Sequence, residues 1–292
     1  MLLEDEPFEQ IEALESRGTT SLTYSVVIKG KSYFLKQLRP EFNSDWRYRA
    51  AFYKEFEIGS KINSKHFVRY VKIDENERGV YLLTEHINGI TLAQKLKEAP
   101  EYFQKSSNFE KLFLQLLQGI GDLHRMHVAY LDINLDNIML TQVNNDVVII
   151  DLGFSFTHSY PNTSGCTHNF AAPELLQGNF KEIDASTDIY AIGKLMQHIQ
   201  HVTCAHVPPH LQHIINRCVN PKKQHRYAST EEVTKKILKK RKLKHTLLAI
   251  AFILGLLVAG YSVLKYTNSY YHIRDQLKSM LVTPEHDFSH TD

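Results

Sequence analysis

The chain has 292 residues and a formal net charge of +2, with 43% hydrophobic and 23% charged residues. These values are typical of a globular protein and exclude a disordered chain. So small a net charge gives no support to nucleic-acid binding. The three cysteines, Cys166, Cys204 and Cys218, lack a metal-binding spacing, and we expect reduced thiols on the cytosolic side. The acidic start of the chain has no apolar core, so we expect no signal peptide.

The first third of the sequence predicts a sheet and one helix after a polar lead-in at residues 1–13. The hydrophobic pattern predicts strands at Leu22–Lys29 and Ser32–Leu38 around a turn at Gly30-Lys31, an amphipathic helix from about Trp46 to Ile62, and a strand at Gly79–Leu83.

Helices dominate the prediction after residue 100. A long helix is expected to begin near Ser107, where Ser107 and Glu110 match a capping box, and to end at His124. We expect a packing role for His124 at this helix end. Ser229 and Glu232 match a second capping box, which marks the start of a final helix.

Three of the oxygen-bearing side chains in the stretch Tyr130–Gly153 have a spacing that carries information. Asp132 and Asn137 are separated by four residues, and Asp151 follows the apolar run Val147–Ile150, which predicts a short buried strand. Carboxylate and amide oxygens suit Mg²⁺, which binds few protein ligands together with substrate phosphates. We therefore expect a metal and phosphate site in this stretch.

The order D-x-x-x-x-N, apolar strand, D-x-G resembles the catalytic core of the eukaryotic-like (Hanks-type) serine/threonine protein kinases, here of the membrane-anchored bacterial type. The resemblance implies that Asp132 is the catalytic residue that orients the accepting hydroxyl. It implies that Asn137 and Asp151 are metal ligands that hold Mg²⁺ (or Mn²⁺) against the phosphates of ATP.

The same resemblance implies an α+β, bilobal protein-kinase fold within a kinase domain at residues 1–240. The N-lobe, at about 12–86, would be an antiparallel sheet plus a helix, and the C-lobe, at about 90–238, would be mostly helical. The hinge between them would offer main-chain hydrogen bonds to adenine, and it matches Thr84, Glu85 and Ile87.

Two further positions resemble the family's phosphate-binding pair. Lys36 resembles the strand lysine that contacts the nucleotide phosphates, and Glu55 resembles the helix glutamate that clamps this lysine, with Glu57 as the alternative. Gly18 and Thr19 stand where the family carries its Gly-rich loop, although only one glycine remains there.

Late motifs separate this chain from small-molecule kinases such as the aminoglycoside phosphotransferases, which generally lack them. Ala171-Ala172-Pro173-Glu174 resembles the Ala-Pro-Glu signature, and Asp188 resembles the structural aspartate of a buried helix. Arg226 stands where the family has the partner of that glutamate. The resemblance therefore implies a buried ion pair between Glu174 and Arg226.

The sequence departs from the family pattern near the catalytic aspartate. Tyr130-Leu131 precedes Asp132 where His-Arg is usual, and Asn134 replaces a lysine that neutralises the phosphoryl group. We expect Asn134 to donate a hydrogen bond in that lysine's place. Gly59 stands where the family usually has a bulky apolar residue that braces the metal-binding loop.

Thr246–Leu264 contains no charged residue. As a helix it would be about 28 Å long, close to the hydrocarbon thickness, so the sequence predicts one transmembrane helix. The basic segment 235–245 precedes it and would face anionic lipid. The positive-inside rule then predicts a cell-membrane protein with a cytoplasmic kinase domain and a short extracytoplasmic tail at 265–292.

The sequence leaves three functions open. An ATP-dependent protein serine/threonine kinase acting on protein hydroxyls fits most of the motifs. A pseudokinase scaffold would account for the sparse Gly-rich loop and for Asn134, and a small-molecule kinase is the third alternative. We expect ATP, a protein substrate and a membrane as partners, and no nucleic acid; pairing with a second copy of the chain stays open.

Overall fold

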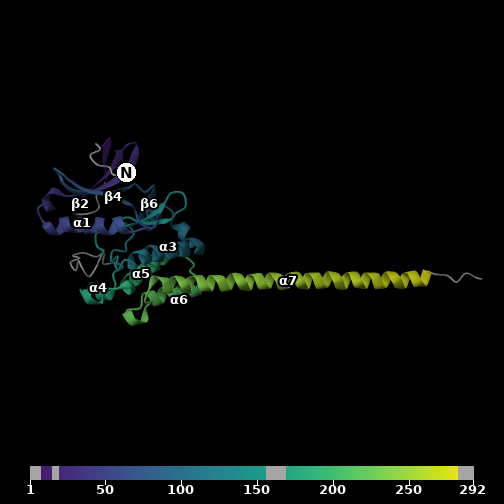
Figure 1. Cartoon of the computed structure of the whole chain (residues 1–292). Helices are drawn as coiled ribbons and strands as arrows, with labels where there is room; N and C mark the ends of the chain where they lie inside the picture. Colours follow the sequence, from purple (N-terminus) through teal and green to yellow (C-terminus); the bar gives the residue numbers. More distant parts are fainter. Residues whose placement is uncertain (1–7, 15–19, 156–168, 282–292) are drawn as a thin grey trace, which may run out of the picture. The chain divides into compact units, whose positions relative to one another are not determined.

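The computed structural model describes residues 8–14, 20–155 and 169–281, and the side chains at 240–249, 251 and 281 lie outside the description. The chain divides into two compact units, Met1–Ile237 and Leu238–Asp292. In the first unit, a sheet with one helix forms one lobe and a group of helices forms the other (Figure 1). This arrangement confirms the expected bilobal fold, with an antiparallel N-lobe sheet and a helical C-lobe.

The N-lobe sheet is antiparallel with the strand order β1-β2-β3-β5-β4. Its strands are β1 (Gln10–Leu14), β2 (Ser21–Ile28), β3 (Lys31–Leu38), β4 (Tyr70–Asn76) and β5 (Gly79–Glu85).

Two details of this sheet differ from the sequence prediction. Residues 1–13 were expected to be a polar lead-in without a strand, and this is wrong from Gln10 onward, because β1 pairs with β2 there. The turn between β2 and β3 lies one residue earlier than expected, at Lys29 and Gly30, since Ile28 pairs with Lys31. Both turn residues have positive φ, 50° and 68°, as a two-residue hairpin turn with the right twist requires.

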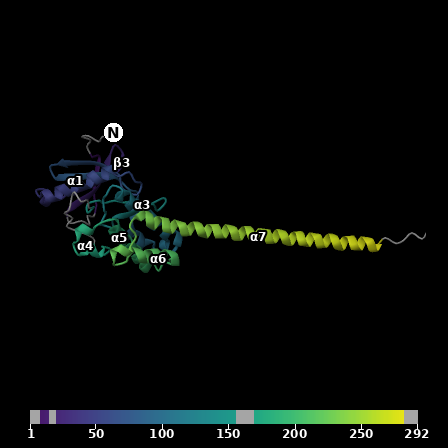
Figure 2. The ribbon, with the colours of Figure 1, turned by 60° about the horizontal axis from the view of Figure 1, so that its bottom comes forward.

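Helix α1 (Trp46–Lys61) packs on the sheet against β3, β4 and β5 (Figure 2). It begins after Asp45, whose carboxylate caps the helix by accepting a hydrogen bond from the Arg47 amide. Phe52 and Ile58 are buried, together with the polar side chain of Glu55. The helix therefore presents a carboxylate to the interior below the sheet.

A second, smaller sheet connects the lobes. It contains β6 (Gly89–Thr91), β7 (Ile138–Thr141) and β8 (Val147–Ile149), all antiparallel. Ile149 also exchanges main-chain hydrogen bonds with the segment before β4, accepting from the Val68 amide and donating to the His66 carbonyl at 2.9 and 2.8 Å. This pairing fixes the end of β8, and hence Asp151, below the N-lobe.

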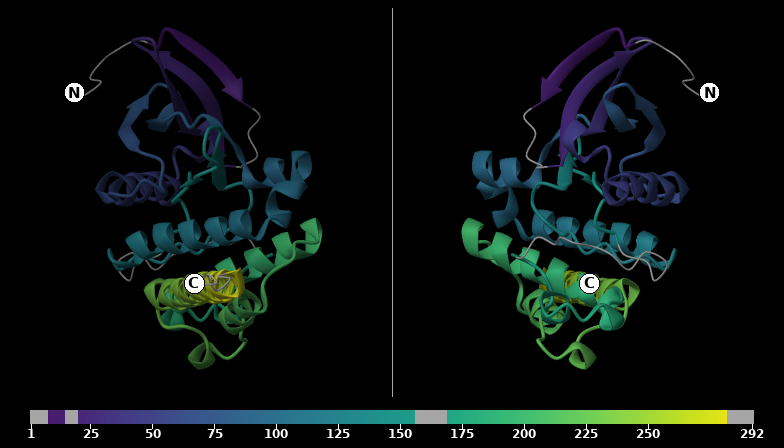
Figure 3. Two further views of the ribbon diagram at one scale, coloured as in Figure 1. Left: turned by 90° about the vertical axis from the view of Figure 1, so that its right-hand side faces the viewer. Right: turned by 90° about the vertical axis from the view of Figure 1, so that its left-hand side faces the viewer.

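The C-lobe is built around α3 and α5 (Figure 3). Its α-helices are α2 (Leu92–Glu98), α3 (Ser106–His124), α4 (Pro173–Leu176), α5 (Ala185–Thr203), α6 (Pro209–Cys218) and the first turns of α7 (Thr230–Leu281). Short 3-10 helices lie at Pro40–Phe42, Pro100–Gln104, Phe180–Glu182 and Lys223–His225.

The two expected capping boxes have different outcomes. Helix α3 begins at Ser106, one residue before the expected start, and no side chain caps it, so the first capping box is wrong. At α7 the Ser229 hydroxyl accepts a hydrogen bond from the Glu232 amide at 3.2 Å, as expected. The Glu232 carboxylate accepts from the Ala228 amide, one residue before the cap.

Helix α7 begins in the first unit and continues into the second. Among the residues that the structure describes, no helix combines the length and the apolar character that crossing a membrane requires. The expected span Thr246–Leu264 includes residues 246–249 and 251, whose side chains lie outside the description.

Candidate active site

Lys36 lies at the centre of a charged cluster assembled from three elements. Its ammonium group, on β3, donates to the Glu55 Oε2 atom on α1 at 3.0 Å and to the Asp151 Oδ2 atom after β8 at 2.9 Å. The structure thus joins the expected lysine and glutamate and adds the expected metal-binding aspartate. Glu57, the alternative partner, is exposed and pairs with Lys61 one helical turn later.

The charges of this cluster depend on each other. Burial alone would lower the pKa of Lys36, but the carboxylates of Asp151 and Glu55 raise it above its ordinary value, so Lys36 keeps its proton. Burial, together with the nearby charge of Asp151, raises the pKa of Glu55 although Lys36 acts in the opposite direction. A hydrogen-bond donor to Glu55 therefore matters for keeping its carboxylate ionised.

Asp132, the expected catalytic residue, is 6% exposed and lies beside Asn137. The side-chain amide of Asn137 donates to the Asp132 Oδ2 atom at 2.6 Å. The Asn134 side chain bonds within the same loop. Its Nδ2 atom donates to the main-chain carbonyl of Asp132. Its Oδ1 atom accepts from the main-chain amides of Asp136 and Asn137 at 2.9 and 2.8 Å. These bonds make Asn134 part of the loop's turn. The hydrogen bond expected from Asn134 in place of the family's lysine stays a prediction.

Asp188, on the buried helix α5, holds the start of this loop. Its two carboxylate oxygens accept from the amides of Tyr130 and Leu131, each at 2.8 Å. Leu131 has a φ of 63°, which is uncommon for a residue with a side chain, so these bonds stabilise a strained conformation. His124 completes the support through Nε2, 2.8 Å from the Asp188 Oδ2 atom, which is more than the packing role expected for it.

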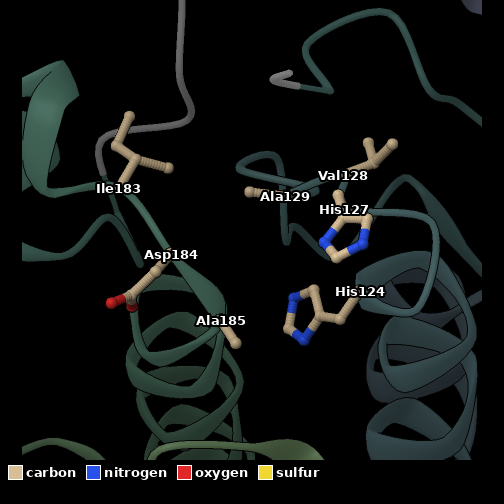
Figure 4. A pocket seen from close by; sticks show the side chains of 7 residues that line it. All are labelled: His124, His127, Val128, Ala129, Ile183, Asp184 and Ala185. Carbon is tan, nitrogen blue, oxygen red and sulfur yellow. The ribbon is translucent and has the colours of Figure 1, made fainter. Parts of the chain in front are cut away.

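A hollow of about 250 Å³ lies beside this support, away from the lysine cluster. His124 and His127 lie on one side of it and Asp184 on the other, with the Asp184 carboxylate turned away from the two histidines (Figure 4). None of the residues expected to bind ATP or metal lines this hollow, and we assign it no part in the expected reaction.

The expected ion pair in the C-lobe is present. Arg226 donates to both oxygens of Glu174 at 2.7 and 2.9 Å, and the Thr187 hydroxyl donates to the same carboxylate. Both charged side chains are almost completely buried. The pair links the segment that precedes α5 to the loop that precedes α7.

The hinge residues lie where the strand β5 leaves the sheet. Thr84 is buried, and the Glu85 amide donates to the Arg69 carbonyl at 2.9 Å. Ile87 packs against the main core. Gly89 follows, and a Cβ atom there would lie 2.3 Å from the Leu140 carbonyl oxygen, so this close approach requires glycine. Of the expected phosphate loop, Gly18 and Thr19 lie outside the described residues.

Two residues that contact the site were missed in the sequence. Tyr70, on β4, donates its hydroxyl hydrogen to the Glu55 Oε1 atom at 2.9 Å. Lys54, on α1, donates to the Ser155 carbonyl at 2.8 Å, four residues after Asp151. Only the unusual Gly59 could have pointed to Tyr70, and no sequence signal pointed to Lys54.

The donor set fits a nucleotide-bound Mg²⁺ better than a metal held by protein alone. In the described parts of the chain, no three or more His, Cys, Asp or Glu residues gather in a way that could hold a metal ion. Asp151 and Asn137 offer hard oxygen ligands, and Mg²⁺ usually completes such a set with substrate phosphates and water. When bound, the ion would neutralise charge on the phosphates.

A bilobal fold with a lysine–glutamate pair, a D-x-G aspartate beside it and a D-x-x-x-x-N loop below defines the protein kinase class. Residues 16–242 match the model of the protein kinase domain, and the chain belongs to this family. The chain is 25% identical over 244 residues to the serine/threonine-protein kinase Nek6 of Oryza sativa, covering 80% of this chain and 45% of that protein.

The chain is also similar to bacterial protein kinases. The chain is 28% identical over 181 residues to PknA of Corynebacterium glutamicum, a serine/threonine-protein kinase, covering 57% of this chain and 37% of PknA. The crystal structure of the PknI kinase domain of Mycobacterium tuberculosis superposes with a TM-score of 0.62 at 17% identity, over 82% of this chain and 99% of that one. This last likeness concerns the fold. The family model places the chain among the protein kinases, and the two curated relatives that it resembles are serine/threonine-protein kinases.

The chain spans less than half the length of these curated relatives.

Proposed function

We propose that the chain is an active kinase that transfers the γ-phosphate of ATP to serine or threonine hydroxyls of proteins. The joined cluster of Lys36, Glu55 and Asp151 supports this most directly. It brings the lysine proposed to bind phosphate and the carboxylate proposed to bind metal together from positions 115 residues apart in sequence. Such an arrangement is the positioning that phosphoryl transfer needs.

The proposed roles follow from the chemistry of each side chain. Asp132 would accept the proton of the incoming hydroxyl, whose oxygen forms a bond to the γ-phosphorus as the bond to the departing ADP oxygen breaks. Lys36 would neutralise phosphate charge and keep the nucleotide aligned. Asn137 and Asp151 would hold the Mg²⁺ that shields the phosphates. The main chain from Glu85 to Ile87 would bind adenine.

The direct test is a radiolabel transfer assay with full-length protein, ATP and Mg²⁺ or Mn²⁺. We expect wild type to label itself or a generic protein substrate, and Asp132→Asn to lower the rate by at least about 10². Asp74→Asn is a matched control, because Asp74 belongs to a surface pair with Lys72 on β4. Absence of transfer by wild type with both ions would contradict the proposal.

A second function, a nucleotide-binding scaffold without turnover, is favoured by one observation. Asn134 is neutral where the family has the charge-neutralising lysine, and its side chain bonds within its own loop. Thermal unfolding with and without ATP and Mg²⁺ separates the two functions. Stabilisation by the nucleotide without phosphate transfer supports the scaffold, whereas stabilisation together with transfer supports the kinase.

We further propose that the chain is attached to a membrane through Thr246–Leu264, with the kinase domain on the cytoplasmic side. The uncharged sequence of this segment and the basic segment 235–245 before it support this proposal. Pairing with a second copy of the chain stays a prediction.

A further inference from the structure

Tyr70 occupies the space that a side chain at position 59 would need. A Cβ atom built on Gly59 would lie 2.2 Å from Cδ2 and 2.4 Å from Cε2 of the Tyr70 ring. Those distances are far shorter than a van der Waals contact, so no side chain fits on Gly59 while the Tyr70 ring is there. Tyr70 is 6% exposed and belongs to the main core. The ring from β4 thus fills the gap that glycine leaves on α1.

The backbone of β4 aims this ring at the active site. Tyr70 pairs with Thr84 on β5, and the register between the strands shifts between Tyr70 and Lys72. Such an irregularity bends a strand and redirects the neighbouring side chain. The hydroxyl group of Tyr70 then reaches the Glu55 Oε1 atom at 2.9 Å, while Lys36 contacts the other oxygen of the same carboxylate at 3.0 Å.

Both oxygens of Glu55 therefore have a donor. The Glu55 side chain is only 4% exposed, so water does not replace a donor that is lost. A buried carboxylate oxygen without a partner is costly, and the carboxylate would then rotate or take up a proton. Either change would remove the fixed acceptor that orients the Lys36 ammonium group.

We propose that Tyr70 is a positioning residue of the kinase: its ring replaces the missing side chain at Gly59, and its hydroxyl holds Glu55 in the orientation that aims Lys36 at the nucleotide phosphates. The effect on rate rests on the proposed kinase function. The effect on Glu55 does not, and it is measurable in a protein without activity.

The first test is Tyr70→Phe in the full-length protein, which keeps the ring and removes the hydroxyl. We expect kcat for transfer to fall by about ten- to a hundredfold, the size of a lost hydrogen bond to a charged group. The KM for ATP should change by less than about threefold, because the hinge contacts are separate from Glu55. A purely structural role of Tyr70 would leave kcat unchanged in the folded variant.

Tyr81→Phe is the matched control. Its hydroxyl also donates to a carboxylate in the N-lobe, Asp74 at 3.2 Å. Its ring belongs to a second, smaller buried cluster of the N-lobe sheet, which does not include Tyr70. We expect wild-type kcat in this variant. A loss in Tyr81→Phe as large as the loss in Tyr70→Phe would overturn the proposal, because any hydroxyl in the lobe would then have the same effect.

The second test does not need activity. A double-mutant cycle of Tyr70→Phe and Glu55→Met, read by urea unfolding, measures the coupling between the two side chains. We expect Tyr70→Phe to raise the equilibrium constant for unfolding about tenfold or more when Glu55 is present. In the Glu55→Met background the same change should leave this constant almost unaltered. Additive effects would overturn the proposal. Coupling without transfer by wild type would contradict only the proposed function.

Discussion

At the scale of single residues, Lys54 is a buried charge beside the active site whose ammonium group bonds to a main-chain carbonyl. It is 6% exposed, and its ammonium group donates to the Ser155 carbonyl. Burial lowers the pKa of Lys54 below its ordinary value, which shows that the charged form is held at a cost. The bond links α1 to the start of the segment that follows Asp151.

Replacing Lys54 by methionine should therefore separate stability from activity. Lys54→Met removes the cost of burying a charge and keeps most of the packing, so we expect an unchanged or slightly raised melting temperature. It also removes the link to Ser155, and we expect the transfer rate to fall about three- to tenfold. Lys61→Met, at an exposed pair on the same helix, is the control and should change neither quantity. An unchanged rate in Lys54→Met would contradict this role.

The residues proposed to contact ATP, metal or substrate have a recognisable spacing in the sequence, whereas the residues proposed to position them do not. Asp132 and Asn137 belong to one loop, and Asp151 follows a strand, so their order along the chain is itself a signal. Tyr70 and Lys54 act through contacts that exist only after packing, and the Lys54 contact spans 101 residues. Their identity follows from the three-dimensional neighbours of Glu55 and Ser155.

At the scale of elements, the pair Glu174–Arg226 joins α4 to the loop before α7. Burial alone would raise the pKa of Glu174, but the hydrogen bonds and charge of Arg226 lower it below its ordinary value of 4.5. A lowered pKa in the folded state means that the ionised carboxylate stabilises the fold. This stabilisation is fully present above pH 4.5 and is lost as the pH falls through the lower folded-state pKa.

Glu174→Gln tests this link. At pH 7 we expect it to lower the free energy of unfolding by about 3–5 kcal/mol, because it leaves the buried charge of Arg226 without a counter-charge. The difference between wild type and variant should narrow as the pH is lowered from 7 to below 4.5, because only wild type loses an ionised carboxylate there. Urea unfolding at several pH values measures it. A difference that is constant with pH would show that the carboxylate charge is not what stabilises the fold.

Sequence patterns located most elements, and their failures have local causes. Every residue of β1 is exposed, so Gln10–Leu14 has no buried face, and its pairing with β2 makes it a strand. The turn before β3 places Lys29 in a left-handed conformation, which a lysine in the sequence does not predict. The start of α3 was misplaced because a capping pattern occurred one residue inside the helix.

At the scale of the whole chain, one buried cluster runs through the first unit from Phe52 on α1 to Ile192 on α5. Phe67, Tyr130 and Leu152 belong to it between the lobes, so the catalytic loop and the segment after Asp151 are part of the core. Changes in either lobe should therefore affect the site through packing as well as through charge. The sequence indicated this core by periodicity but gave no contacts across the lobes.

The last prediction concerns the attachment of the chain to a membrane. If Thr246–Leu264 crosses the bilayer, full-length protein made in bacterial cells should float with membranes in a density gradient after an alkaline wash. Leu256→Lys with Val258→Lys should release it, because each lysine at the centre of a span costs about 2.5–3.5 kcal/mol. Asn268→Lys with Ser269→Lys, outside the segment, adds the same charge and should leave the protein with the membranes. Wild type that stays at the bottom of the gradient, or a Leu256 and Val258 variant that still floats, would contradict the proposed span.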